Sequence, residues 1–401
     1  MGNYRWTTDL IISTYYQALT GDIPTGINYR TGASNGGFDL LHFDFEEKTF
    51  DQSTIDENEF DLSLDLNKRG TGRSIRISQP TYGGGMSFGS ISLNFMLARA
   101  IAAKRLNTFT CTGEGGYPEE LLPYKDHVIT QVATGLFGVR EETIQHAPIV
   151  EFKYAQGAKP GLGGHLLADK VTAQVAKMRD SMAFSSLFSP SPFHSVYSVE
   201  DHKKHVDWIK ITNPSALVSV KVSTPKDVEM VAIGSYFAGA NIIHIDGAYG
   251  GTGAAPEIAK KNIAMPIEYA IPKVHKYLEQ EGVRDEVTLI ASGGIRTAYD
   301  VAKAIALGAD GVVIGTAENI AIGCTHCGNC ERGRGCQIGI ASADPELSLY
   351  RPVDWAAERI VNLYTAWKKQ YRMILAGLGL RSISELRGRT DLLYYGGNGH
   401  A

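Results

Sequence analysis

Residues 287–317 read VTLIASGGIRTAYDVAKAIALGADGVVIGTA, and this stretch places two short apolar runs on either side of an amphipathic segment long enough for a helix. The first run is followed by SGG (292–294) and the second by GT (315–316). The two ends lie about 22 residues apart, the length of one strand–helix unit. Glycines directly after a strand leave backbone N–H groups uncovered, and the next helix adds its positive end, so the pair predicts a phosphate-binding site. Tight turns without a ligand are the alternative.

The same alternation of apolar runs and amphipathic segments extends upstream, as in VSVKV (218–222) and NIIHIDG (241–247). A repeated strand–helix unit favours a parallel α/β architecture, and nearly continuous apolar strands indicate a sheet buried on both faces. In barrels of eight such units, the loops after strands 7 and 8 hold a phosphate. Placing the two decisive runs as strands 7 and 8 leaves about 215 residues after Ile75 for six units, so we predict an α/β fold of the (β/α)8 TIM-barrel type.

A doubly wound nucleotide-binding fold is disfavoured. It requires an early G-x-G-x-x-G motif after the first strand and an acidic residue about 20 residues further on. The nearest candidate is GGGMSFG (83–89), and no acidic residue follows it on a strand at that distance.

The chain divides into four expected segments. Residues 1–75 are aromatic, acidic and weakly periodic, which predicts an N-terminal extension that wraps the barrel. The barrel itself is expected over residues 76–320. A cysteine-rich loop follows at 321–345, and the helical spacing that begins after it predicts a C-terminal helical cap over 346–401.

Composition excludes several classes of partner. The formal net charge of −4 gives no basic footprint for nucleic acid. No run of about 18 apolar residues is present, so no membrane-spanning helix is expected. The N-terminus has no charged-then-apolar secretory signal, and we expect a cytoplasmic protein. Thiols stay reduced in that compartment, so clustered cysteines indicate a metal site rather than disulfides.

Three charged residues of interest lie upstream, two of them in glycine-rich loops. Glu114 lies in CTGEGG (111–116) and Lys159 in QGAKPGLGG (156–164). A carboxylate in such a loop can relay protons, and a lysine can bind an anionic substrate or act as an acid; solvated turn charges are the alternative. Lys221 stands alone in the apolar strand VSVKV, where burial requires a partner: a cofactor's ring edge or an internal ion pair.

Four of the five cysteines lie in the segment IGCTHCGNCERGRGCQIG with the spacing C-x2-C-x2-C-x5-C. They are Cys324, Cys327, Cys330 and Cys336. Zinc sites usually consist of two well-separated pairs, whereas three cysteines at two-residue intervals resemble the start of a ferredoxin cluster run. The spacing favours an iron–sulfur cluster, with zinc and unliganded thiols as alternatives.

Taken together, the motifs identify a family. PTYGGGMSFGSIS, CTGEGGYPEE, QVATGLFGV, QGAKPGLGGH, SPSPFHSVYSVED, VSVKV, DGAYGGTGAAP, the 287–317 stretch and the cysteine segment occur in this order. This order resembles the FMN-binding synthase domain of glutamate synthases over about residues 75–391. The resemblance implies an FMN-containing barrel in which 2-oxoglutarate and ammonia give 2-iminoglutarate, which reduced flavin converts to L-glutamate, and hence an oxidoreductase acting on CH–NH2 donors.

The resemblance also assigns residues. Glu114 matches the catalytic carboxylate, and Lys159 matches the lysine that binds the 2-oxo acid. The implied cofactor-binding residues are Met86, Ser87, Thr112, Gln156, Lys221, Gly251, Thr252, Ser292, Gly293, Gly294, Arg296, Gly315 and Thr316. Lys221 beside the flavin would stabilise negative charge on the reduced ring.

The family carries a three-iron cluster on three cysteines after its last barrel strand. Cys324, Cys330 and Cys336 match those positions, and Cys327 is additional. We expect Cys327 to be a fourth ligand, which favours [4Fe–4S] over [3Fe–4S]. No NAD(P)-binding segment is visible, so electrons are expected from a partner, ferredoxin or a reductase subunit. Glutaminase and glycine-repeat functions are expected on separate subunits of an oligomeric assembly.

Three loop positions depart from the family pattern. Leu136 replaces an arginine, Leu162 a glutamate and His165 a glutamine. The first two changes lie near the expected substrate site, so a different amine or 2-oxo acid, as in N-methylglutamate synthase, is an alternative. A non-catalytic electron-transfer subunit is a second alternative, which the intact Glu114 and Lys159 disfavour.

Overall fold

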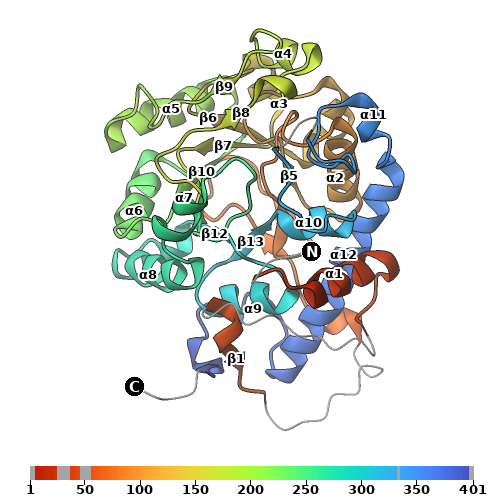
Figure 1. Ribbon diagram of the computed structural model, residues 1–401. Helices are drawn as coiled ribbons and strands as arrows, with labels where there is room; N and C mark the ends of the chain where they lie inside the picture. Colours follow the sequence, from red (N-terminus) through yellow and green to blue (C-terminus); the bar gives the residue numbers. More distant parts are fainter. Residues whose placement is uncertain (1–4, 25–36, 46–55, 332–334, 397–401) are drawn as a thin grey trace.

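The computed structural model describes residues 5–24, 37–45, 56–331 and 335–396. Its centre is an eight-stranded parallel barrel surrounded by helices (Figure 1). The barrel strands are β4 (Thr81–Gly83), β5 (Thr110–Cys111), β6 (Val128–Ala133), β7 (Ile149–Lys153), β10 (Leu217–Ser223), β11 (Ile242–Asp246), β12 (Thr288–Ser292) and β13 (Gly311–Ile314). The predicted (β/α)8 fold is therefore confirmed, and the two decisive runs are its seventh and eighth strands.

Neighbouring strands follow one another around the barrel in chain order, and β13 returns to pair in parallel with β4. The ring closes between β4 and β5, where the Gly83 amide donates to the Phe109 carbonyl at 2.8 Å and a parallel bridge joins Gly85 to Cys111. Every residue of β10 and β11 is buried, as expected for strands covered by helices outside and by packed side chains inside.

Helices cover the outside of the barrel. They are α2 (Leu93–Arg105), α3 (Glu141–His146), α5 (Val199–Thr212), α6 (Val228–Ala238), α8 (Ile267–Gln280), α9 (Ala298–Ala306) and α10 (Thr316–Ala321). The α9 helix illustrates how the local sequence sets the start, the buried face and the end of these helices. Thr297 caps its first turn by accepting from the Asp300 amide, and its alanines and Val301 are buried against the barrel. Gly308, at φ 123°, lets the chain turn into β13.

Two insertions lie at the carboxyl ends of the strands. Between β7 and β10 stand β8 (His165–Leu166), η5 (Ala168–Lys170), α4 (Ala173–Met178) and β9 (Leu187–Phe188), with β8 and β9 antiparallel. Between β11 and α8 stands the short helix α7 (Glu257–Asn262). The remaining 3-10 helices are η1 (Gly37–Leu40), η3 (Glu57–Glu59), the nine-residue η4 (Glu119–His127), η6 (Arg284–Glu286) and η7 (Thr390–Leu392).

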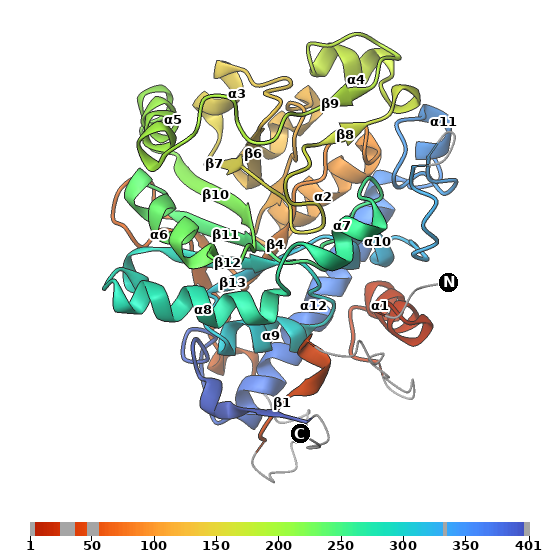
Figure 2. The same ribbon diagram turned by 60° about the vertical axis from the view of Figure 1, so that its left-hand side comes forward.

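The two ends of the chain pack together outside the barrel. Helix α1 (Thr8–Thr20) lies against α12 (Val353–Gly377), which follows the single-turn helix α11 (Pro345–Ser348) (Figure 2). Strand β1 (Leu41–Phe43) pairs antiparallel with β14 (Leu393–Tyr395), and β2 (Leu64–Asp65) with β3 (Arg76–Ile77). The four-segment division expected from the sequence stays a prediction.

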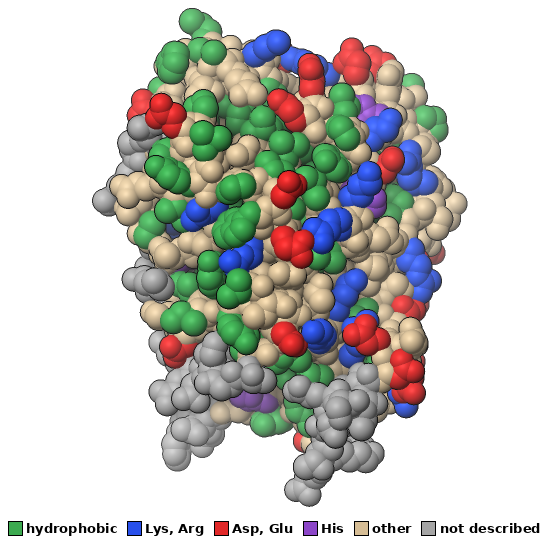
Figure 3. All heavy atoms as spheres, turned by 90° about the vertical axis from the view of Figure 1, so that its right-hand side faces the viewer, with side chains coloured by type: hydrophobic (Ala, Val, Ile, Leu, Met, Phe, Trp, Pro, Cys, Tyr) green, Lys and Arg blue, Asp and Glu red, His purple; other side chains and the backbone are tan. Residues whose placement is uncertain are grey.

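One face of the molecule shows both signs of charge interspersed (Figure 3). On the face drawn in Figure 3, lysine and arginine side chains alternate with acidic and apolar ones. Over the described residues, no helix combines the length and the apolar composition needed to cross a membrane.

Candidate active site

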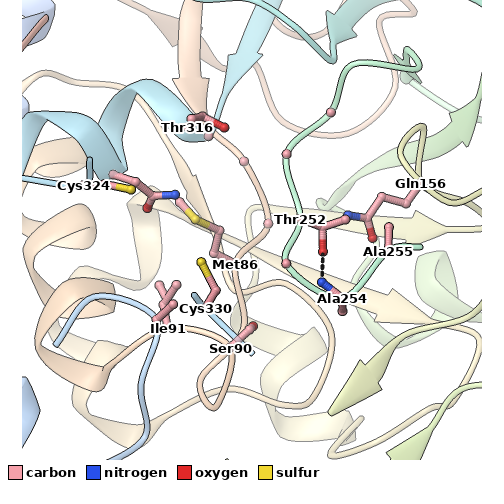
Figure 4. Close-up of a pocket in the computed structure, with 18 of the residues that line it drawn as sticks. Met86, Ser90, Ile91, Gln156, Thr252, Ala254, Ala255, Thr316, Cys324 and Cys330 are labelled. Carbon is pink, nitrogen blue, oxygen red and sulfur yellow. Dashed lines mark hydrogen bonds between the residues drawn. The ribbon is translucent and has the colours of Figure 1, made fainter. Parts of the chain in front are cut away.

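A cavity of about 1100 Å³ opens at the carboxyl ends of the barrel strands. Its wall is formed by residues from every barrel strand or from the loop that follows it, together with the cysteine segment. All but two of the residues that the sequence nominated line it, namely Met86, Ser87, Glu114, Gln156, Lys159, Lys221, Gly251, Thr252, Ser292, Gly293, Gly294, Gly315, Thr316, Cys324, Cys327, Cys330 and Cys336. Figure 4 shows Met86, Cys324 and Cys330 on one side of the close-up, with Gln156 and Thr252 across from them.

Thr112 and Arg296 do not line the cavity. The Thr112 hydroxyl donates to the Gly113 carbonyl at 2.9 Å and accepts from the Gln131 amide at 3.2 Å. The guanidinium of Arg296 forms ion pairs with Asp39 and Asp300 beneath the N-terminal segment. Neither side chain lines the cavity, and the expected cofactor contacts of these two residues stay predictions.

The ends of β12 and β13 form an open, glycine-lined corner of the cavity. Gly293 and Gly294 adopt φ of 96° and 95°, and a Cβ on Gly293 would lie 2.5 Å from the Gly247 carbonyl oxygen. Only glycine fits these two positions. A Cβ on Gly315 would meet nothing within 4 Å, so its backbone faces open space. Arg5 also lines this corner and donates to the Gly294 carbonyl at 3.2 Å.

Arg5 is a site residue that sequence reasoning missed. Its guanidinium stacks 3.8 Å from the centre of the Tyr249 ring and adds a positive charge to the corner. A corner of bare amides beside a buried cation fits the phosphate of a nucleotide. Because Arg5 lies far in sequence from the glycines it joins, no local motif could have indicated it.

Lys221 lies on the cavity wall with its ammonium 3.6 Å from the Asp246 carboxylate. Burial favours the neutral lysine, but Asp246 and Glu151 outweigh it and raise the pKa of Lys221. Burial likewise opposes charge on Asp246, and Lys221 and His244 outweigh it, so the pKa of Asp246 is lowered. The wall thus holds a fixed positive charge that is already paired, and the internal ion pair expected as an alternative is present.

Three cations surround Glu114. Burial alone would raise the pKa of its carboxyl, but Lys153, Arg179 and Lys159 outweigh burial and lower it. The Lys153 ammonium lies 3.5 Å from Glu114 Oε2. The carboxylate also passes close to the chain at residue 164, where a Cβ would lie 1.4 Å from Glu114 Oε1. A glycine at position 164 is therefore required by the position of Glu114.

Arg179, like Lys153, is a site residue that sequence reasoning missed. It follows α4 directly, is 3% exposed, and lines the cavity. It donates to the Ser87 hydroxyl at 3.1 Å and to the Phe88 carbonyl at 2.9 Å, and its Nε has no partner among the described residues. Burial lowers its pKa to about 10, against the opposing effect of Glu114. An arginine at a helix end usually indicates a solvated charge, so no local signal marked Arg179 as a site residue.

The four thiols of the cysteine segment face the same cavity, with Cys327 exposed and the other three partly buried. Burial, and then the thiols of Cys330, Cys336 and Cys327, raise the pKa of Cys324 to about 11. A Cβ on Gly253 would lie 3.0 Å from the Cys330 Cβ, so the loop after β11 touches this segment. Over the described part of the chain, no three cysteine, histidine or acidic side chains converge as metal ligands. The donor chemistry of the four thiols suits an iron–sulfur cluster.

The departing positions lie mostly outside the site. Leu136, at φ 53°, is 54% exposed, and Leu162 is 38% exposed. Neither belongs to the cavity wall, whereas His165 does.

Comparison with known proteins decides the family. The description "Conserved region in glutamate synthase" matches residues 31–381. This chain belongs to the glutamate synthase family. As a glutamate synthase family member it is an oxidoreductase of the class that acts on CH–NH2 donors.

Individual relatives agree with this assignment. The chain is 42% identical to the archaeal glutamate synthase [NADPH] of Methanocaldococcus jannaschii over 354 residues, which cover 88% of this chain and 68% of that one. It is 40% identical to the archaeal-type glutamate synthase [NADPH] of Thermotoga maritima over 412 residues, covering 97% and 80%. Among solved structures, the recombinant flavin-binding domain of baker's yeast flavocytochrome b2 superposes with a TM-score of 0.54 at 16% identity, covering 98% and 82%, which shows a shared fold.

Proposed function

We propose that this chain is the synthase subunit of a glutamate synthase, which reductively aminates 2-oxoglutarate to L-glutamate with FMN in the barrel cavity and an iron–sulfur cluster on the cysteine segment. The observation that carries the proposal is one cavity that combines a glycine-lined anion corner, a wall lysine, an ionised carboxylate among cations and four thiols. Family membership supplies the reaction class.

The anion corner fits the phosphate of FMN, with Gly293, Gly294, Gly315 and Arg5 as the groups that would hold it. Lys221 would lie at the ring, where its charge favours electron density on the reduced form. When bound, the flavin supplies the electron pair that reduces a carbon–nitrogen double bond. The chain's own contribution is to orient the ring and to keep a positive charge beside it.

The cations around Glu114 fit a dicarboxylate substrate. Lys153, Lys159 and Arg179 provide three positive charges, and Glu114 provides one negative charge. The excess positive charge would favour binding of an anion. Lys159 would hold the 2-oxo carboxylate and polarise its carbonyl. The buried Nε of Arg179 is one further donor for the substrate.

Glu114 would move the proton. Ammonia adds to the carbonyl carbon of 2-oxoglutarate, the carbonyl oxygen leaves as water, and 2-iminoglutarate results. Glu114 is ionised at neutral pH because its pKa is lowered, so Oε2 can accept a proton from the attacking amine and return it to the departing oxygen. Two electrons and two protons then convert the imine to the amine of glutamate.

Cys324, Cys330 and Cys336 would bind the cluster, with Cys327 as the fourth ligand. A cluster transfers single electrons, and a partner protein, ferredoxin or a reductase subunit, would supply them. Separate subunits are proposed for ammonia release from glutamine and for the glycine-repeat function. Leu136 and Leu162 lie off the cavity wall, so these two departures do not favour a substituted amine over ammonia.

The proposal is tested by mixing the anaerobically reduced protein with 2-oxoglutarate and either ammonium or methylamine. We expect flavin reoxidation and glutamate formation with ammonium. Glu114→Gln should slow this reoxidation at least about 100-fold, whereas the exposed Glu142→Gln, a matched control, should not change it. Reoxidation with methylamine alone would favour an N-methylglutamate synthase, and no reoxidation with either amine would favour an electron carrier.

A further inference from the structure

A continuous set of buried hydrogen bonds runs behind the cavity wall. Gln131, on the wall, donates to Glu151 Oε1 at 2.8 Å. Glu151 Oε2 lies 2.9 Å from His244 Nδ1, and His244 Nε2 lies 2.7 Å from the Ser292 hydroxyl. Glu151 and His244 do not reach the cavity and are 2% and 1% exposed.

The chain of contacts returns to the wall through Asp246. The Ser292 hydroxyl lies 2.6 Å from Asp246 Oδ1, and Asp246 Oδ2 lies 3.6 Å from the Lys221 ammonium. The strand register brings these groups together, because Lys221 is opposite His244 on β10 and β11, and Asp246 is opposite Ser292 on β11 and β12.

The available hydrogens determine which group donates in each hydrogen bond between Asp246, Ser292 and His244. Asp246 Oδ2 accepts from the Gly157 amide at 2.8 Å and faces the Lys221 ammonium, so this carboxylate is an acceptor. The Ser292 hydroxyl has one hydrogen, and two oxygens 2.6 Å apart need it between them. Ser292 therefore donates to Asp246, and the Nε2 of His244 must donate to Ser292.

The other ring nitrogen is constrained in the same way. Glu151 accepts from the Gln131 side-chain amide and from the Ser219 hydroxyl at 3.1 Å. Burial opposes its charge, but His244, Lys221 and Gln131 outweigh burial and lower the pKa of Glu151 to about 2, so it acts as a carboxylate acceptor. The contact between Glu151 and His244 Nδ1 then needs a hydrogen on the nitrogen. Both ring nitrogens of His244 are donors, which is the imidazolium form.

We infer that His244 is held as an imidazolium between Glu151 and Ser292, and that it is a positioning residue that balances the charge behind the cavity wall. Its charge compensates Glu151, while Lys221 compensates Asp246. Without the imidazolium, one buried carboxylate would be uncompensated close to the cavity. The orientation of Ser292, and through it that of Asp246 and Lys221, depends on the Nε2 hydrogen.

The other groups facing this pair do not supply a competing charge. Cys111 on β5 lies with its sulfur 4.0 Å from Glu151 Oε1, and burial raises the pKa of this thiol to about 12. Tyr82 on β4 is fully buried near Glu151, and burial raises the pKa of its phenol. Around neutral pH, the nearby charges are therefore those of Lys221 and Asp246.

Nitrogen NMR of the full-length protein labelled at histidine tests the inference directly. A ring nitrogen that carries a hydrogen is split by it in the nitrogen spectrum, whereas a bare ring nitrogen is not. We expect His244 to show hydrogens on both ring nitrogens, and we expect this signal to be absent from His244→Asn and present in the exposed control His194→Asn. A bare ring nitrogen on His244 would overturn the inference.

The consequence for a flavin rests on the proposed function and needs a second measurement. In His244→Asn, the midpoint potential of bound FMN should become more negative, because the uncompensated Glu151 opposes reduction. The double variant Glu151→Gln/His244→Asn removes both charges and should return the potential toward that of the unmodified protein. If the midpoint potential in the double variant were as negative as in His244→Asn, the balancing role would be contradicted. If no FMN binds, the proposed function fails while the NMR result still decides the state of His244.

Discussion

At the scale of single residues, the site is defined by how charges compensate one another under burial. Glu114 stays ionised because the combined effect of three cations exceeds the cost of burying its carboxylate. Glu114 and Lys159 could be predicted from the sequence because each sits in a glycine-rich loop. Lys153 and Arg179 could not, since their role depends on where β7 and the β8–β9 insertion place them.

Arg179 offers the sharpest test at this scale. We expect Arg179→Gln to raise the KM for 2-oxoglutarate about 10- to 100-fold, because a charged hydrogen bond is worth about 1.5–3 kcal/mol. Steady-state kinetics with saturating ammonium would measure it. The matched control is Arg140→Gln. Arg140 is exposed and pairs with Asp180, so its substitution should leave KM unchanged. An unchanged KM in Arg179→Gln would remove Arg179 from the substrate site.

At the scale of elements, the strand ends fix where ligands bind. The loops after β12 and β13 were predictable because apolar runs followed directly by glycines are a local signal. The contact between the loop after β11 and Cys330 was not, because it joins two irregular segments whose meeting depends on barrel closure. The antiparallel β8–β9 pair is likewise too short to leave a periodic pattern.

A substitution at Gly315 should affect ligand binding without affecting folding. A methyl group at this position meets no protein atom within 4 Å and projects into the cavity. We expect Gly315→Ala to keep its stability within about 0.5 kcal/mol and to weaken FMN binding at least about 100-fold. Flavin titration and thermal unfolding measure the two effects.

Gly293→Ala is the contrasting variant. Its added Cβ would lie 2.5 Å from the Gly247 carbonyl oxygen at φ 96°, so we expect a loss of stability of about 1–3 kcal/mol or more. If Gly315→Ala bound FMN as tightly as the unmodified protein does, the phosphate would have to lie outside the glycine-lined corner.

The cysteine segment makes a prediction of its own. If Cys327 is the fourth ligand, Cys327→Ser should lower the iron content from about four to about three per chain and alter the paramagnetic resonance spectrum. Cys111→Ser, a buried cysteine outside the segment, should leave both unchanged. Iron content and spectrum equal to those of the unmodified protein would reject Cys327 as a ligand.

At the scale of the whole molecule, Asp310 joins segments from both ends of the chain to the barrel. Its buried carboxylate contacts Lys68, Arg284 and Arg387, and it accepts from the Leu289 amide at 2.7 Å. The barrel was predictable from its repeated units. These connections were not, since single charged residues in irregular segments do not indicate their partners.

We expect Asp310→Asn to destabilise the protein by about 3–5 kcal/mol, because it leaves the buried Arg284 guanidinium without its carboxylate partner. Burial opposes the charge, but Arg284 and Lys68 outweigh it and lower the pKa of Asp310 to about 2. Its contribution is therefore complete above about pH 4 and is lost as the pH falls toward about 2. Denaturant unfolding between these pH values should show a weaker acid dependence in the variant.

The matched control is Asp285→Asn, which removes an exposed partner of the same Arg387. Surface ion pairs contribute about 0–1 kcal/mol, so little change is expected. Equal losses in the two variants would contradict the structural role of Asp310.

The central claim is that the glycine-lined corner binds the phosphate of a flavin, and a binding titration tests it most directly. The purified protein, cleared of flavin and titrated with FMN and separately with riboflavin, should bind about one FMN per chain and riboflavin at least about 100-fold more weakly, a difference of roughly 2.7 kcal/mol. Equal affinity for the two compounds, or no binding of either, would contradict it.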